Sequence, residues 1–240
     1  WMGGGTWGAP IFNIIDYNTM SSLGNSIDFG DLQRSDREMA GTSNAIRGLA
    51  YGGYNDPDGA DTDEIDYITI ASTGNASDFG NLLGGKGICA SPTRGIISGG
   101  QVPAAHNIIQ YVTIMTTGNA TDFGDLTVPQ RDMGSGGNSK RGLFIGGSTT
   151  SDARTNVISY ITIATLGNAV DFGDISTKQS QCSTASSPTR AVTSGGNDDS
   201  STVNTMVYVT IETTGNTAEF GDLTALSETN NSVSNAHGGL

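Results

Sequence analysis

The sequence predicts an all-β fold: a five-bladed β-propeller with four-stranded antiparallel blades, its ring closed by strand exchange between the termini. Three observations lead to this prediction. A block of about 48 residues occurs five times along the 240-residue chain. Each block is rich in turn signals that separate short strand-forming segments. The unfinished end of the last block is supplied by the N-terminus. We therefore expect residues 1–240 to form a single domain.

The repeat is marked by four recurring positions. A Gly-Gly pair precedes a tyrosine strand, a Gly-Asn pair ends eight residues after the tyrosine, and an acidic residue, Phe and Gly follow. The intervals between Gly-Gly pairs are 49, 47, 47 and 49 residues. The tyrosines are Tyr17, Tyr67, Tyr111, Tyr160 and Tyr208. A period of this length indicates stacked units that bury their hydrophobic faces against one another.

The tyrosine strands are apolar on both faces. Alternate residues of a strand point to opposite sides. In residues 108–114, Ile109 and Tyr111 lie on one side, and Val112 and Ile114 lie on the other. A sheet with one wet face would alternate apolar and polar residues. The pattern therefore predicts blades that pack against neighbours on both sides.

The remaining elements of the repeat follow from turn chemistry and side-chain size. The Gly-Asn pair predicts the turn between the third and fourth strands, since both residues tolerate positive φ. The segment before each Gly-Gly strand has small side chains, as in residues 41–43 and 89–91. We expect these segments to be the innermost strands, which crowd one axis. Cys89 and Cys182 occupy this part of two repeats, so both should be buried and free.

Closure of the ring follows from the way the two ends align. From Gly196 through the chain end and on to Gly4 is 48 residues. Residues 237–240 followed by 1–4 align with residues 140–147. A linear array needs atypical polar caps, and this sequence has none. We therefore expect residues near Val233 to form the inner strand of the blade that contains Tyr17.

The charge balance excludes several partners. The chain has 24 acidic and 11 basic residues, for a net charge of -13. A surface of this sign repels nucleic-acid backbones and anionic membrane surfaces. No apolar run approaches the ~20 residues of a membrane span. We expect neither nucleic-acid binding nor membrane insertion.

The repeat resembles the kelch repeat: Gly-Gly closes the second strand, Tyr lies in the third and an aromatic residue lies in the fourth. The aromatic residue is Trp in kelch and Phe in this chain. A longer pattern is similar to repeats in structural and tail-associated proteins of marine tailed bacteriophages. Residues 111–126 and 160–175 have nearly that form, and Arg131 and Arg141 follow. The resemblance covers essentially the whole chain. It implies a virion component, in the extracellular particle, that binds other virion proteins or a host-surface glycan or protein.

The candidate binding residues lie in the uneven loops after the Gly-Gly pairs, which we expect on one face of the ring. These loops are residues 5–10, 54–64, 101–107, 148–156 and 197–204. Variable loops on a rigid scaffold commonly carry binding. The candidates are Asp56, Asp58, Asp61, Asp63, Glu64 and His106.

The acidic segment at residues 55–64 allows two interpretations. Alternating carboxylates at Asp56, Asp58, Asp61 and Asp63 are typical of a calcium loop, because Ca²⁺ takes six to eight oxygen ligands. The EF-hand order is not met, so a solvated acidic loop is the alternative. No other cofactor is expected.

The recurring arginines also allow two interpretations. Each fixes a neighbouring carboxylate or strand-end carbonyl groups, or together they form a ring that binds an anionic or sugar ligand. These residues are Arg47, Arg94, Arg141 and Arg190.

No catalytic constellation stands out, since His106 and His237 lie at different points of their repeats. We expect a non-catalytic binding or structural module rather than an enzyme. The alternative function is a carbohydrate-binding propeller lectin with repeated sites.

Overall fold

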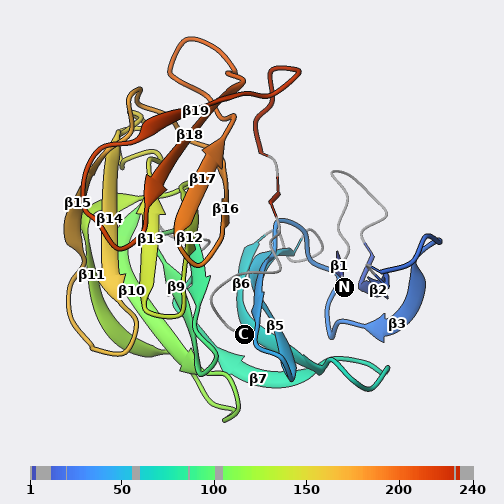
Figure 1. The fold of residues 1–240 in the computed structure, drawn as a ribbon. Helices are drawn as coiled ribbons and strands as arrows, with labels where there is room; N and C mark the ends of the chain where they lie inside the picture. Colours follow the sequence, from blue (N-terminus) through green and yellow to red (C-terminus); the bar gives the residue numbers. More distant parts are fainter. Residues whose placement is uncertain are drawn as a thin grey trace.

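The computed structural model describes residues 2–3, 12–19, 21–55, 60–85, 87–100, 105–229 and 231–232. Throughout these residues the regular structure is β-strand, in one three-stranded and four four-stranded antiparallel sheets. The sheets follow one another around a common centre in a propeller-like arrangement (Figure 1). In this part of the chain no helix has the length and apolar character needed to cross a membrane.

Each sheet is formed by consecutive strands. The first contains β1 (Met2–Gly3), β2 (Ile14–Tyr17) and β3 (Ile27–Asp31). The second contains β4 (Ala40–Ser43), β5 (Arg47–Asn55), β6 (Ala60–Thr69) and β7 (Ser77–Asn81). The third contains β8 (Gly87–Ala90), β9 (Arg94–Ser98), β10 (His106–Thr113) and β11 (Thr121–Gln130).

The last two sheets repeat this order. The fourth contains β12 (Gly134–Gly137), β13 (Arg141–Ile145), β14 (Val157–Thr162) and β15 (Val170–Asp174). The fifth contains β16 (Ser183–Ser186), β17 (Arg190–Ser194), β18 (Thr205–Thr210) and β19 (Ala218–Asp222). The predicted four-strand repeat is therefore confirmed in four of the five sheets.

The segments with small side chains are the innermost strands, as predicted. β4, β8, β12 and β16 each form one edge of a sheet, and successive members contact each other. A side-chain hydroxyl links two such strands where the Ser186 Oγ accepts the Gly137 N–H at 2.9 Å. A Cβ added to Gly136 would lie 2.5 Å from that same oxygen. The close approach explains why this edge excludes bulky residues.

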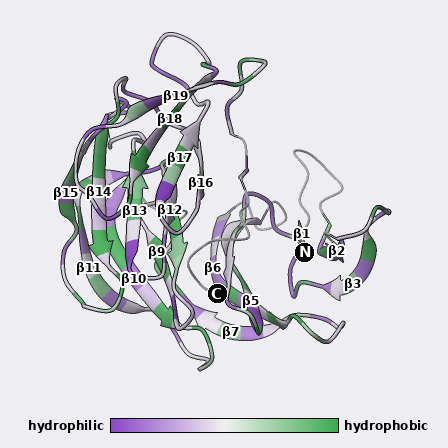
Figure 2. Cartoon of the chain, viewed as in Figure 1, coloured by the Kyte–Doolittle hydropathy of each residue, from purple (hydrophilic) through white to green (hydrophobic). Residues whose placement is uncertain are grey.

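Hydrophobic clusters fill the space between successive sheets. Between the third and fourth sheets, Ile109 and Phe123 pack with Phe144 and Ile161. Figure 2 shows hydrophobic residues along the strands of these two sheets. Within every sheet the repeated Tyr and Phe rings meet edge to face, with centroids 5.8–6.2 Å apart. The prediction of packing on both faces of the tyrosine strand is confirmed.

The N-terminus contributes a strand to the first sheet. β1 pairs antiparallel with β2, and Met2 lies opposite Asp16. In the sequence alignment, position 1 matches Phe144 and Asp16 matches Ser159, and Phe144 pairs with Ser159. The alignment therefore predicts position 1 opposite Asp16, and the observed register differs from it by one residue. The predicted inner strand near Val233 lies outside the described residues.

Candidate functional site

In the second, third and fourth sheets, the recurring arginine connects its own sheet to the next sheet along the chain. The Arg47 guanidinium lies over the Tyr67 ring, 4.4 Å from its centroid, and donates to the Ile114 carbonyl of the next sheet at 3.2 Å. Arg94 and Arg141 repeat both contacts, with the carbonyls of Ile163 and Ile211 at 2.7 and 2.9 Å. The interpretation that these arginines fix strand-end carbonyl groups is confirmed for these three. Arg190 stacks over Tyr208 at 4.6 Å, and its side chain is exposed.

The Gly-Asn pairs make a contact between sheets that we call the outer clasp. At the first clasp the Gly74 N–H donates to the Phe29 carbonyl at 2.7 Å, and the Ala76 N–H donates to the Asp31 carbonyl at 2.8 Å. The Asn75 Oδ1 accepts the Asp31 N–H at 3.1 Å. Asn119, Asn168 and Asn216 accept the equivalent amides at 3.1, 3.1 and 3.0 Å. The pair does join the third and fourth strands as predicted, but it also binds the preceding sheet.

The outer clasp explains the glycine after each repeated Phe. Gly124 has φ of +147°, and a Cβ there would lie 2.5 Å from the backbone carbonyl of Gly167 in the next sheet. Gly30, Gly80 and Gly173 meet the following Gly-Asn turn in the same way. This position therefore requires glycine for two reasons: its φ is positive, and two backbones approach closely there.

The acidic segment is largely part of a hairpin, which corrects the expectation of a loop at residues 54–64. β5 and β6 extend beyond the core of the sheet, with Tyr54 opposite Asp61. The buried Asp36 carboxylate holds the outer part of this hairpin, accepting from Asn55 at 2.8 Å and from Thr62 at 3.2 Å. Hydrogen bonds from both strands to one buried carboxylate, rather than apolar packing, hold the extended part of the hairpin together.

The candidate residues of this segment separate into two groups. Asp61 and Asp63 are exposed on β6, and Glu64 pairs with Arg34 at 2.9 Å. Asp56 and Asp58 lie outside the described residues. Within the described ranges no three His, Cys, Asp or Glu side chains are grouped to hold a metal ion. A calcium site that uses Asp56 and Asp58 stays a prediction.

His106 begins strand β10 rather than lying in a loop, opposite Gln130 on β11. Both ring nitrogens are removed from solvent and have no hydrogen-bond partner among the described residues. Burial lowers the pKa of the imidazole, so the neutral form is favoured. The expectation of an accessible loop histidine is therefore corrected: its polar atoms do not face a partner in solution.

A polar network at the loops of the fourth and fifth sheets was not foreseen from the sequence. Arg154 in the loop at residues 148–156 donates to the Asn197 Oδ1 at 3.1 Å and lies 3.4 Å from an Asp199 carboxylate oxygen. The Glu228 carboxylate accepts from Asn197 at 3.3 Å and from Thr202 at 3.1 Å. The sequence shows that these loops are uneven, but pairing across them depends on the arrangement of the sheets.

The loop at residues 197–204 is shaped by Asp198. Its carboxylate accepts the N–H groups of Ser200 and Ser201 at 3.0 and 2.9 Å. These bonds lower the pKa of Asp198, with the Ser201 amide as the largest cause. Together with the Arg154 contacts they give this part of the loop face a defined shape.

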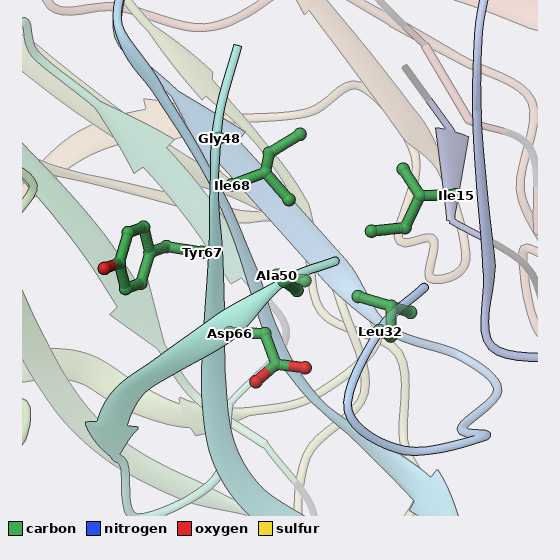
Figure 3. A pocket seen from close by; sticks show the side chains of 8 residues that line it. Ile15, Leu32, Gly48, Ala50, Asp66, Tyr67 and Ile68 are labelled. Atoms are coloured by element: carbon green, nitrogen blue, oxygen red, sulfur yellow. The ribbon is translucent and has the colours of Figure 1, made fainter. Parts of the chain in front are cut away.

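Asp66 lies beside a gap between the first and second sheets. Ile15, Leu32 and Ile68 line this gap, and Figure 3 shows the Asp66 carboxylate next to it. The gap leaves no room for a water molecule. The Asp66 Oδ2 accepts the Gln33 N–H at 3.1 Å. Burial nonetheless raises the pKa of this carboxyl group, and the Gln33 bond only partly opposes that shift.

The two cysteines are buried and free, as predicted. Burial raises the pKa of Cys89 to about 12 and that of Cys182 to about 11. A thiol is nucleophilic only when deprotonated. Neither cysteine is therefore suited to covalent chemistry near neutral pH.

The repeated Tyr, Phe, Arg and Asn side chains are thus largely engaged within and between sheets, whereas the acidic residue before each Phe is exposed. The surface that differs from sheet to sheet lies at the loops. No protein-family model matches the chain, and no curated protein matches it.

Proposed function

We propose that the protein is a non-catalytic binding and structural module whose uneven loop face recognises its partner. One observation carries the proposal: the recurring Tyr, Phe, Arg and Gly-Asn residues are largely accounted for by folding, and the recurring side chain left exposed is the acidic residue before each Phe. Tyr, Phe and Arg pack within each sheet, Phe and Arg also contact a neighbouring sheet, and Gly-Asn forms the outer clasp. Side chains that every sheet needs for its own packing are poor carriers of specificity. The loops are free of that requirement.

We further propose that the sheets form a closed ring with the termini exchanged. The chain that leaves the fifth sheet takes the same turn as the chain between earlier sheets. Thr229 has φ of 55°, as Asp132 and Gln181 have 53° and 56°. The Thr229 N–H donates to the Gln181 backbone carbonyl at 3.0 Å, just as the Gln181 N–H donates to the Asp132 backbone carbonyl at 2.7 Å.

The segment after this turn is placed to begin one more inner strand. Ser232 bonds to Ser183 on β16 through their hydroxyl groups at 2.5 Å, next to the inner edge of the fifth sheet. The first sheet has β1, β2 and β3 but no described inner strand. In the closed ring the residues after Ser232 fill that place and give the first sheet its fourth strand.

The proposed setting is a bacteriophage virion, where the module binds another structural protein or a host surface. The support for this setting is the resemblance of the repeat to those of phage structural and tail-associated proteins. A lectin with repeated sugar sites would need equivalent free side chains in every sheet. The equivalent Arg, Tyr and Asn side chains are used within and between sheets, and the equivalent side chain that stays exposed is the acidic residue before each Phe.

The test is detection of the chain in purified virions by immunogold labelling, followed by incorporation of two variants. Replacing residues 56–59 by Gly-Ser-Gly-Ser changes the loop face and leaves the Asp36 contacts with Asn55 and Thr62 in place. Thr117→Lys alters an exposed residue of an outer turn and serves as the matched control. We expect unchanged melting of both variants and reduced incorporation of the first alone. Normal incorporation of the first variant, with loss of incorporation of the second, would show that the binding site lies at the outer turns and not on the loop face. Binding of free glycans with about five equivalent sites would support the lectin instead.

A further inference from the structure

The fifth sheet carries an unused copy of the clasp surface. Phe220 is 52% exposed, whereas Phe29, Phe79, Phe123 and Phe172 are 2–6% exposed. A Cβ added to Gly221 would meet no described atom within 4 Å, although its φ of +145° matches that of its equivalents. The Asp222 N–H and carbonyl hold the positions at which Asp174 bonds to Asn216 and Thr217 in the preceding clasp.

The first sheet carries the complementary half. Gly24, Asn25 and Ser26 hold the positions that Gly74, Asn75 and Ala76 hold in the second sheet, and all three are exposed. Both halves of a fifth clasp are therefore present, each without its counterpart among the described residues.

We propose that Gly24, Asn25 and Ser26 dock on Phe220, Gly221 and Asp222 of the same chain and form the fifth outer clasp. The inference rests on the closed ring proposed above. In this contact the Gly24 N–H donates to the Phe220 carbonyl, and the Asn25 Oδ1 accepts the Asp222 N–H. The Ser26 N–H donates to the Asp222 carbonyl. Each bond copies one that the other four clasps contain.

A second contact belongs to the same seam. Asp16 holds the position of Asp66, whose carboxylate accepts the Gln33 N–H of the preceding sheet. Thr224 follows the fifth repeat's Asp-Leu as Gln33 follows the first. The Asp16 carboxylate therefore accepts the Thr224 N–H when the seam forms.

The seam has a polar residue at a position that is apolar in the other four interfaces. Ile68, Val112, Ile161 and Val209 are 2–4% exposed and pack against the preceding sheet. Asn18 occupies this position in the first sheet. Burying an amide without full hydrogen bonding is costly. The seam is therefore the least stable of the five interfaces, and the first to open on heating.

The experiment compares three Gly→Ala variants by thermal melting. Gly124→Ala combines positive φ with a backbone collision at an existing clasp, whereas Gly118→Ala has φ of +151° and open space. If the seam forms, Gly221→Ala should lose as much melting temperature as Gly124→Ala, and clearly more than Gly118→Ala. A Gly221→Ala loss no larger than that of Gly118→Ala would overturn the clasp. The proposed loop-face binding would remain intact, since it is measured separately by virion incorporation.

Two further measurements complete the test. Light scattering should give a monomer for the wild-type chain. A dimer or larger species that dissociates in Gly221→Ala would show that a second copy occupies the face, and would overturn the inference. Asn18→Val should raise the melting temperature if the seam buries this position. Thr19→Val should not, because the position of Thr19 is exposed in every sheet. Equal, small effects of the two valines would count against the seam, even if the glycine variants fail to fold.

Discussion

At the scale of single residues, one position shows how a buried polar site varies between repeats without losing its function. Asp66 accepts the Gln33 N–H, and in the next sheet Gln110 accepts the Leu83 N–H at 2.9 Å. Gln110 also donates to the Gly84 carbonyl at 3.2 Å. The common requirement is a hydrogen-bond acceptor for the connection between two sheets. A charge is not required, and burial makes the charged form of Asp66 unfavourable in the folded state.

This difference predicts a pH effect. Because burial raises the pKa of Asp66, the folded state keeps a proton that the unfolded state releases near the usual pKa of ~3.9. Stability should therefore fall as pH rises from that value through the folded pKa, and stay lower above it. Asp66→Asn keeps an acceptor and removes the charge. It should melt at a higher temperature than wild type at neutral pH, with the difference shrinking toward pH 4.

The measurement is melting temperature against pH, and the effect should be at most a few degrees, since ~1 kcal/mol corresponds to roughly 2–4 °C for a chain of this size. Asp63→Asn, at an exposed position of the same strand, serves as the control and should change the curve less. A uniform loss of stability in Asp66→Asn at all pH values would show that the carboxylate is needed as such.

At the scale of elements, the hairpin and the clasp differ in how far the sequence could predict them. The Gly-Asn turn between β6 and β7 follows from local preference, because both residues tolerate positive φ. Its contact with Asp31 joins residues 44 positions apart and depends on how the sheets are placed. The same limit applies to the long β5–β6 hairpin. Its polar outer part has the sequence of a solvated loop, because Asp36, which organises it, lies in a different repeat connection.

The clasp predicts a modest cost for removing its side-chain bond. Asn119→Ala deletes the acceptor of the Asn81 N–H, an exposed amide that water can then solvate. The loss should be about 0.5–1.5 kcal/mol, the usual net value of such a bond. Asn119→Asp keeps an acceptor and should recover most of the stability in a urea titration. Equal losses in both variants would mean that the turn conformation, rather than the bond, is what Asn119 supplies.

At the scale of the whole molecule, repetition made the architecture predictable and the binding surface much less so. The innermost strands, the tyrosine strands and the buried cysteines follow from a pattern copied in every repeat. The loop contacts of Arg154 with Asn197 and Asp199 occur once, between two loops of unrelated sequence. The prediction that His106 lies in a loop was wrong for a related reason. Its position next to Gln130 depends on how far β10 and β11 extend, which no repeat motif specifies.

The closed ring gives the prediction that belongs to this scale. Ser227, Thr229 and Ser232 bond to the fifth sheet and its connections, as when the Gly196 N–H donates to the Ser227 carbonyl at 2.8 Å. Removing residues 225–240 would therefore damage that sheet whether or not the ring is closed. Removing only residues 233–240 takes away the proposed inner strand of the first sheet and leaves those bonds in place. In a closed ring the short deletion should already be insoluble or strongly destabilised, because it leaves unpaired strand edges, which promote aggregation. Urea titration of both deletions beside the full chain is the measurement. If the short deletion unfolds with the full chain and only the long one is destabilised, the termini do not exchange strands.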